Sequence, residues 1–230
     1  MLQVEAVGKR FGERVVLSSA SLHVLAGECR VILGRNGAGK STLLSIAAGA
    51  CQPDYGWVRF AGRDLANAGV SRRAWLGQLY IPERGWLTTT ASVDDHWRML
   101  DDTVGSALSH EELRTLLPPP LLAQRPYSLS SGERRRAELA LAICRAPTCL
   151  LIDEPLRSLA PLDVDQVIGL FQRLMRQGTA IVCTGHEVPA LLTVATYVTW
   201  CTDGTTYDLG APAVALEHWR FTREYLGVGA

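Results

Sequence analysis

The sequence predicts an α/β fold with a mostly parallel sheet, and three observations support this. Apolar runs of strand length alternate with amphipathic segments of helix length. A glycine-rich loop at 34–41 lies between a strand-like run and a helix-like run. The fully apolar run Cys149–Ile152 leads directly into Asp153 and Glu154. Fully apolar strands are typical of a sheet covered on both faces.

The N-terminal part of the chain is predicted to be rich in strands. Residues 15–25 alternate apolar and polar side chains, and the runs 57–60 and 75–81 also have strand character. Residues 29–33 form a further apolar run that ends at the glycine-rich loop. We therefore expect a β-rich entry that leads into a nucleotide-binding core.

The middle of the chain is predicted to be helical. Residues 92–117 have a helical, acidic pattern, with acidic pairs at 94–95 and 111–112 near the expected helix starts and three prolines at 118–120 that end it. A second α/β half follows, with predicted helices at 132–145 and 162–175 and predicted strands at 149–152, 179–183 and 197–201.

The composition bounds the possible functions. The chain has 230 residues, 47% of them hydrophobic and 20% charged, enough for one complete core and a small second lobe. Its 23 basic and 23 acidic side chains cancel, so no overall charge favours nucleic acid, and we expect no nucleic-acid partner. The basic run 134–136 lies in a helical pattern, where a solvated or partner-facing surface is expected.

The cysteines and the hydrophobic segments indicate a compartment. Six cysteines lie apart from one another, without C-x-x-C pairs, which predicts buried free thiols in a reducing environment. The sequence shows no secretory signal, and no window approaches the ~18 consecutive apolar residues of a membrane span. We expect a cytoplasmic protein that can dock on a membrane protein.

The glycine-rich loop is the strongest sequence signal for function. Residues 34–41 read Gly-Arg-Asn-Gly-Ala-Gly-Lys-Ser, which matches G-x-x-x-x-G-K-S/T. Backbone N–H groups of such a loop form a nest for phosphates, and the following helix adds its positive end. Lys40 can reach the β and γ phosphates, and the Ser41 hydroxyl can bind Mg²⁺. The alternative is a turn that merely joins a strand to a helix. The predicted nucleotide contacts are Gly34, Arg35, Asn36, Gly37, Ala38, Gly39, Lys40, Ser41 and Thr42.

The two carboxylates after the apolar strand are the second signal. Two such groups are costly to bury unless they meet a cation or a reacting water. Asp153 suits a Mg²⁺ shell, and Glu154 suits a base that orients the water attacking the γ phosphate. Taken alone, the pair is explained equally well by a surface turn.

Between these two signals, residues 129–133 read Leu-Ser-Ser-Gly-Glu. This segment resembles the Leu-Ser-Gly-Gly-Gln signature of the ATP-binding subunits of ATP-binding cassette (ABC) transporters, and the resemblance extends over about residues 1–212. It implies a P-loop NTPase core of the ABC type with an N-terminal antiparallel β subdomain and a helical subdomain. In the family, the signature of one subunit closes over the γ phosphate held by its partner. Carried over to this chain, that role falls to Ser130, Ser131, Gly132 and Glu133. Ser130 and Ser131 could equally cap a helix with Glu133.

The resemblance assigns further residues. Phe11 stands where the family places an aromatic ring that stacks on adenine, although a core residue at a strand end is an alternative. His186 matches the histidine that contacts the γ phosphate, and Lys40 and Glu154 complete the expected catalytic set. Glu83 occupies the position of a glutamine that senses Mg²⁺, so the expected metal ligands are Ser41, Asp153 and Glu83.

The resemblance also implies a division of the chain. Residues 1–230 would form a single ABC ATPase domain. The nucleotide-binding core would comprise 1–83 and 128–212, the helical subdomain 84–127, and a C-terminal helical tail 213–230.

Three positions depart from the family pattern. Glu83 replaces a glutamine, and Ser131 replaces the first glycine of the signature. Ala160 replaces an aspartate that crosses the dimer interface, a contact on which cooperative hydrolysis rests in the family. Asp163 follows three residues later and cannot take the same place without a shift.

These observations lead to one main hypothesis. The chain is expected to be an ATPase subunit that dimerises around two Mg-ATP and drives transmembrane permease subunits, at the inner face of the cell membrane. The second ATPase subunit would be an identical or a related chain. The alternatives are a soluble ABC ATPase acting as assembly factor or clamp, and a hydrolysis-impaired, ATP-gated binding module suggested by Ala160.

Overall fold

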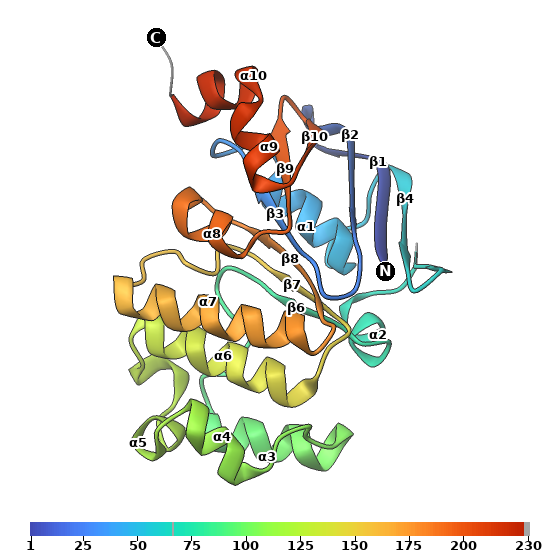
Figure 1. Cartoon of the computed structure of the whole chain (residues 1–230). Helices are drawn as coiled ribbons and strands as arrows, with labels where there is room; N and C mark the ends of the chain where they lie inside the picture. The colour runs from blue at the N-terminus through green and yellow to red at the C-terminus, as the bar shows by residue number, and fades with distance from the viewer. Residues whose placement is uncertain (66, 228–230) are drawn as a thin grey trace.

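The computed structural model describes residues 1–65 and 67–227, so the last three residues of the expected tail lie outside the described residues. Ten strands form one sheet in the order β5-β4-β1-β2-β10-β9-β3-β8-β7-β6 (Figure 1). The strands are β1 (Leu2–Phe11), β2 (Arg14–Val24), β3 (Cys29–Leu33), β4 (Tyr55–Phe60), β5 (Arg63–Asp64), β6 (Gln78–Ile81), β7 (Cys149–Ile152), β8 (Ala180–Thr184), β9 (Tyr197–Thr202) and β10 (Thr205–Gly210).

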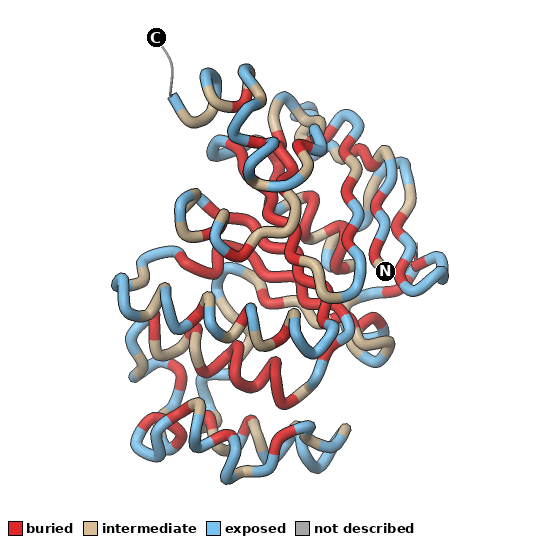
Figure 2. Tube along the Cα trace, in the orientation of Figure 1, coloured by how far each residue is buried: buried red, intermediate tan, exposed pale blue. Residues whose placement is uncertain are grey.

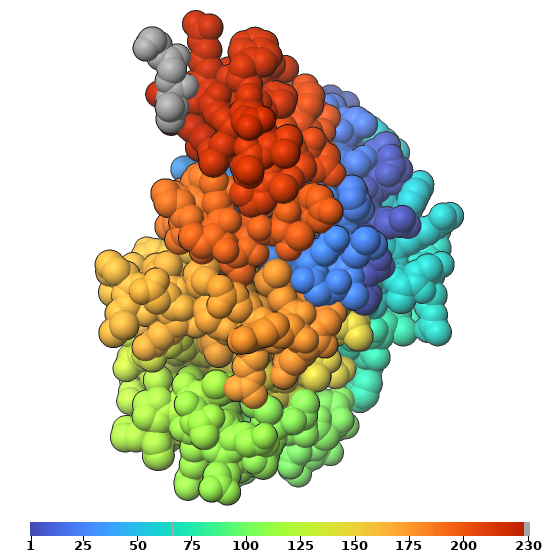
Figure 3. Space-filling view, in the orientation of Figure 1, coloured from blue at the N-terminus to red at the C-terminus, as the bar shows by residue number. Residues whose placement is uncertain are grey.

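Helices cover both sides of this sheet (Figure 1). The α-helices are α1 (Lys40–Ala48), α2 (Val70–Trp75), α3 (Val93–Val104), α4 (His110–Leu116), α5 (Pro119–Leu122), α6 (Ser131–Arg145), α7 (Pro161–Arg176), α8 (Val188–Val194), α9 (Pro212–Glu217) and α10 (Trp219–Phe221). A 3₁₀ turn at Pro126–Ser128 and a π-helical turn at Thr222–Leu226 complete the elements. In Figure 3 the C-terminal segment and helices α3–α5 lie at opposite ends of the molecule.

The N-terminal strands form the predicted antiparallel part of the sheet. β1 pairs antiparallel with β2 and β4, and Leu2 lies opposite Val24 on one side and Phe60 on the other. Alternate residues of β1 are buried at its start, as a strand with one covered face requires. These side chains share a core with α1, which lies beside them (Figure 1).

The centre of the sheet is parallel. β3 pairs with β8 and β9, and β8 also pairs with β7, which pairs with β6. Every residue of β3, β7 and β8 is buried, in agreement with the prediction of strands covered on both faces. Because parallel strands end at the same edge, the segments after β3, β7 and β8 meet there.

Helix α6 is largely buried, with ten of its fifteen residues buried. It packs between α7 and α3, and Figure 2 shows most of its turns as buried. This packing explains a wrong prediction: Arg135, in the basic run expected to face solvent or a partner, is only 8% exposed. Its guanidinium pairs with Glu138 at 2.9 Å and donates to the Glu83 carbonyl at 3.1 Å. Three consecutive helical residues point in widely different directions, so a helix covered on two sides must bury one of them.

The acidic pairs mark helix starts as predicted. Ser92 with Asp95, Ser109 with Glu112, and Ser130 with Glu133 form capping boxes at α3, α4 and α6. Helix α4 ends at Leu116, before the three prolines. The short helix α5 then begins at Pro119. Proline is tolerated in its first turn because the N–H that proline lacks has no partner inside the helix there.

One strand prediction is wrong at its start. The apolar run 75–81 was expected to be a strand, but Trp75 ends α2 and the strand begins at Gln78. Gly77, with φ +94°, separates the two elements. A short apolar run does not distinguish a helix end from a strand by its periodicity.

The cysteines are free, as predicted, and five of the six are buried. Burial raises the pKa of Cys149 to about 12, so this thiol stays neutral. Cys51 is the exception, because it follows the end of α1 in a half-exposed bend.

The buried Arg135–Glu138 pair gives a stability prediction. Replacing Arg135 by Leu leaves the Glu138 carboxylate without its counter-charge, in a place where burial already raises its pKa. We expect Arg135→Leu to lower the unfolding free energy by about 3 kcal/mol, and Arg135→Leu/Glu138→Leu to recover part of that loss. Urea unfolding measures both. Arg134→Leu, one residue earlier and half-exposed, is the matched control, and equal midpoints for the two single variants would contradict the prediction.

Candidate functional site

The glycine-rich loop joins β3 to α1 in a conformation that needs its glycines. Gly37 and Gly39 have φ values of +80° and +105°, which non-glycine residues rarely adopt. A Cβ on Gly34 would lie 2.1 Å from the Cys201 carbonyl oxygen. Gly39 is also the N-cap of α1, with no side chain to occupy the first N–H groups of the helix. The loop and helix therefore present backbone donors to an anion.

Lys40 is held inside this loop. Its side chain is 5% exposed, and its Nζ donates to the Gly34 carbonyl at 2.8 Å and to the Arg35 carbonyl at 3.3 Å. Burial lowers the pKa of the ammonium group, while the nearby Glu154 carboxylate acts in the opposite direction. The lysine is thus a buried cation at the centre of the loop.

Ser41 and Asp153 connect the loop to the end of β7. The Ser41 hydroxyl donates to Asp153 Oδ1 at 3.1 Å, and the Thr184 hydroxyl donates to the same oxygen at 2.5 Å. Thr184 also accepts from the Glu154 backbone N–H at 3.0 Å. The sequence analysis missed Thr184, because the predicted strand stopped one residue before it. No local pattern marks Thr184, because it lies beside Asp153 only through the pairing of β7 with β8.

Glu154 and His186 meet at the same edge. His186 Nε2 lies 3.0 Å from Glu154 Oε1, while Oε2 is buried without a hydrogen-bond partner among the described residues. Burial raises the pKa of Glu154 to about 7, and burial together with the Lys40 charge lowers the pKa of His186. Both shifts disfavour the charged forms, so the contact has the character of a hydrogen bond more than of an ion pair. Glu154 also has φ +47°, a strained conformation for a non-glycine residue.

Lys40, Ser41, Glu154 and His186 line one cavity of about 330 Å³, which we call the Lys40 cavity. Phe11 lies at this cavity and is 54% exposed, so the alternative of a core residue is wrong. The cavity brings together residues from the β1–β2 turn, the glycine-rich loop and the segments after β6, β7 and β8: Phe11, Arg14, Val16, Asn36, Gly37, Gly39, Lys40, Ser41, Thr42, Glu83, Glu154, Arg157 and His186. Arg157, which the sequence analysis did not select, pairs with Glu83 at this cavity.

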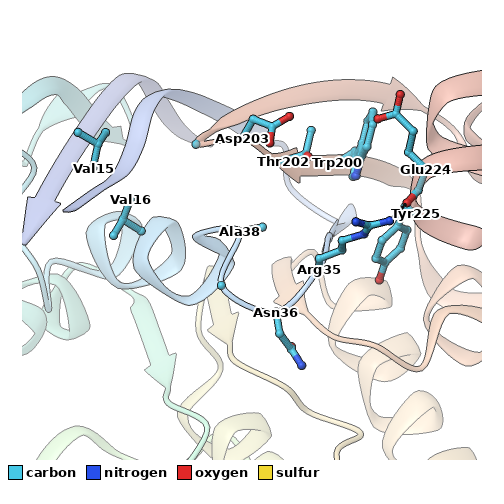
Figure 4. Close-up of a pocket in the computed structure, with 12 residues that line it drawn as sticks. Val15, Val16, Arg35, Asn36, Ala38, Trp200, Thr202, Asp203, Glu224 and Tyr225 are labelled. Atoms are coloured by element: carbon cyan, nitrogen blue, oxygen red, sulfur yellow. Dashed lines mark hydrogen bonds between the residues drawn. The ribbon is translucent and has the colours of Figure 1, made fainter.

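A second cavity, of about 500 Å³, lies beside the same loop (Figure 4). Arg35, Asn36, Gly37 and Ala38 form one wall, and Glu224 and Tyr225 of the C-terminal segment form part of another. The Arg35 guanidinium donates to the Glu224 carbonyl at 2.6 Å. Arg35, expected to contact nucleotide, thus directs its side chain to the C-terminal segment. Lys40, Ser41 and Glu154 line the smaller cavity and not this larger one, so the smaller one carries the chemistry.

The signature segment lies elsewhere in the chain. Ser130 and Glu133 form the capping box of α6, as the alternative prediction had it, and both serines 130 and 131 are exposed. None of Ser130, Ser131, Gly132 and Glu133 is among the described residues that line the Lys40 cavity. Within one chain the two parts therefore remain separate.

The segment after Glu154 packs against the signature of the same chain. Ala160 is the N-cap of α7, and its methyl side chain offers no hydrogen bond. Asp163 lies in the first turn of α7, 3.5 Å from Arg136, and a Cβ added to Gly132 would fall 2.1 Å from its carboxylate. Asp163 thus faces α6 and does not replace the missing aspartate. The Ser131 hydroxyl donates to the Ser158 carbonyl at 2.9 Å.

The raised pKa of Glu154 predicts a pH effect on stability. The folded chain holds the Glu154 proton up to about pH 7, whereas the unfolded chain releases it near the ordinary glutamate pKa of 4.5. Between these values the folded state binds more protons, so this group lowers stability as pH rises. We expect the stability gained by Glu154→Gln over wild type to grow from pH 5 to pH 7.5 in urea unfolding. A pH-independent difference between the two proteins would contradict the assignment.

Comparison with known proteins places this geometry in a family. The sequence model of the ABC transporter family matches residues 17–157. The chain is 30% identical to the lipopolysaccharide export system ATP-binding protein LptB of Acidithiobacillus ferridurans, over 99% of this chain and 97% of that protein. It is 34% identical to the aliphatic sulfonates import ATP-binding protein SsuB of Pseudomonas putida, over 94% of this chain and 80% of that protein.

Solved structures have the same fold. A nucleotide-free ATP-binding cassette from an ABC transporter has a TM-score of 0.84 at 19% identity, with 100% of this chain and 99% of that one covered. A dimeric ATP-binding cassette in a post-hydrolysis state, bound to ADP and Pi, has a TM-score of 0.78 at 21% identity, with 91% and 99% covered. The chain belongs to the ABC transporter family, as an ATP-binding subunit that hydrolyses ATP.

Proposed function

We propose that this chain binds Mg-ATP in the Lys40 cavity, hydrolyses it there with a second subunit, and thereby drives a membrane permease. The observation that carries the proposal is the meeting of three groups at one sheet edge: the buried Lys40, the Ser41–Asp153 contact at 3.1 Å, and the Glu154–His186 contact at 3.0 Å. They supply a phosphate anchor, a cation site and a proton acceptor respectively.

The phosphates are proposed to bind to the glycine-rich loop. The N–H groups at the start of α1 and the Lys40 ammonium would neutralise the β and γ phosphates. Phe11, exposed at the cavity, would stack on the adenine ring. Lys9, whose Nζ lies 5.5 Å from the Phe11 ring centre, adds positive charge beside that ring.

The donor set fits a magnesium ion. Mg²⁺ prefers hard oxygen ligands and commonly takes only one or two from protein, with substrate phosphates and waters completing the shell. Ser41 and Asp153 already place two such oxygens together, and Glu83 lines the same cavity. Within residues 1–65 and 67–227, no group of three His, Cys, Asp or Glu side chains could hold a metal by itself. In the proposed site, protein oxygens and ATP phosphates bind the ion together. When bound, the ion would supply positive charge to the phosphate oxygens.

Glu154 is proposed to act on the attacking water. A pKa raised to about 7 places this carboxylate near the optimum for a general base at neutral pH. Its Oε2 atom, buried without a described partner, is the free acceptor, while Oε1 is oriented by His186. His186, which lines the same cavity, would in turn contact the γ phosphate.

A second subunit is proposed to complete the site. The exposed Ser130 and Ser131 begin a helix of fifteen residues but lie outside the cavity of their own chain. A second copy, or a related chain, could place these serines over the γ phosphate held by Lys40. Ser130, Ser131, Gly132 and Glu133 would then act across a dimer interface with two Mg-ATP.

The chain is proposed to work on the inner face of the cell membrane, bound to transmembrane permease subunits. Within residues 1–65 and 67–227, no helix has the length and apolar character needed to cross a bilayer. In this proposal the permease forms the membrane path, and the ATPase pair drives it by closing around ATP and reopening.

Glu154→Gln tests the proposed base. The amide cannot accept the proton, yet it preserves shape, so we expect ATP turnover to fall by about 10³-fold or more while ATP-dependent dimerisation persists. Phosphate release and size-exclusion chromatography measure the two properties. Glu187→Gln, which changes a neighbouring carboxylate that does not line the cavity, is the matched control. Unchanged turnover in the assembled complex would remove Glu154 from this role.

The permease partner is tested by isolation from the native membrane. A tagged chain should copurify with a multi-span membrane protein, and mass spectrometry should identify it together with the second ATPase subunit. Recovery of soluble assembly factors without any membrane protein would favour the alternative of a non-transport ABC ATPase.

A further inference from the structure

The ion pair between Glu83 and Arg157 lies at the nucleotide cavity and serves no role assigned so far. Glu83 follows β6, Arg157 follows β7, and both line the cavity together with Lys40 and Ser41. Their side chains are 42% and 60% exposed, and the carboxylate and guanidinium are in contact. Each side chain can therefore reach either its partner or a ligand in the cavity.

The charge balance of the cavity makes this pair significant. Mg-ATP carries a net negative charge, and the cavity receives it with the cations Lys40 and Arg14. A carboxylate at position 83 would repel the phosphates unless a cation cancelled it. Arg157 supplies that cation, so the unusual acidic residue and the arginine compensate each other.

The backbone ties both residues to the reactive groups. The Arg157 N–H donates to the Glu154 carbonyl at 3.3 Å, so Arg157 belongs to the tight turn that begins at Glu154. The Glu83 carbonyl accepts from Arg135 of α6 at 3.1 Å. The side chains of Glu83 and Arg157 are both exposed enough to exchange partners. Exposed ion pairs contribute little to stability, so this exchange costs little.

We propose that Arg157 is a positioning residue for the nucleotide: it neutralises Glu83 when the cavity is empty, and it turns to the terminal phosphate when Glu83 turns to the cation of Mg-ATP. This inference rests on the proposed nucleotide site and adds a residue to it. Glu83 and Arg157 thus give up their mutual ion pair together and each pairs with one part of the ligand. The Mg²⁺ of the ligand takes the Glu83 carboxylate as its counter-charge, and the phosphates take the Arg157 guanidinium.

The test is a double-mutant cycle on nucleotide affinity. Equilibrium titration measures the Kd of ATP and of ADP for wild type, Glu83→Gln, Arg157→Ala and the double variant, each with excess Mg²⁺ and with EDTA. Circular dichroism checks that each variant is folded. Arg84→Ala, which removes an exposed arginine outside the cavity, is the matched control.

Arg157→Ala should raise the Kd of ATP by about 10-fold, because Glu83 then faces the phosphates alone and the arginine contact is lost. The rise should be smaller for ADP, and Arg157→Lys should restore much of the affinity. The effect of Glu83→Gln on the Kd of ATP should change sign with the metal. In EDTA the variant should bind ATP more tightly than wild type, because the freed Arg157 attracts phosphate. With Mg²⁺ it should bind ATP more weakly than wild type. In EDTA the double variant should return close to wild type.

Two results would overturn the proposal. One is an unchanged Kd for Arg157→Ala with both nucleotides, and the other is an effect of Glu83→Gln on the Kd of ATP that has the same sign in Mg²⁺ and in EDTA. Failure of the nucleotide site itself is recognised separately: wild type would then bind ATP no better than Lys40→Ala. If Lys40→Ala abolishes binding while Arg157→Ala binds both nucleotides like wild type, the site stands and only the role of Arg157 falls.

Discussion

The candidate site depends on the parallel register of three buried strands. Ile32 of β3 lies opposite Thr184 of β8, and Ile152 of β7 lies opposite Cys183. This register puts Thr184 beside Asp153, so one hydroxyl can donate to the carboxylate and also accept from the next backbone N–H. The strands are buried throughout, and a shift by one residue would turn apolar side chains toward the site. The packed sheet therefore fixes the polar groups at its edge.

The same edge gives two adjacent carboxylates different surroundings. Asp153 accepts from the hydroxyls of Ser41 and Thr184, which hold it in one orientation toward the glycine-rich loop. The Glu154 carboxylate contacts His186 through one oxygen, and its second oxygen lacks a partner among the described residues; burial raises its pKa. Neighbouring acids whose environments differ in this way can divide two tasks, cation binding and proton acceptance, between them.

Features of the site that depend on residues close in sequence were predicted, whereas features that depend on tertiary packing were not. The glycine-rich loop, the carboxylates after β7 and the capping boxes depend on residues close in sequence, and the structure has them as expected. Thr184 and Arg157 could not be selected, because their importance depends on which strands are adjacent and how a turn is folded. Arg135 was assigned to the surface because a sequence does not show that α6 is covered on two sides. The helix end at Trp75 was missed because apolar content alone does not distinguish the two secondary structures.

Two departures from the family pattern meet at one place in the structure. Ala160 removes the carboxylate expected in the segment after Glu154, and this segment would then lack a polar side-chain anchor. Ser131, which stands where the family has glycine, donates its hydroxyl to the Ser158 carbonyl in that same segment at 2.9 Å. The segment is thus held by α6 of its own chain, and Asp163 packs on the same helix at Gly132. Because Arg135 of α6 also holds the Glu83 carbonyl, movement of this helix would reach Glu83 and the segment after Glu154 together. Helix α6 therefore links the signature segment to Glu83 and to the segment after Glu154 in the same chain.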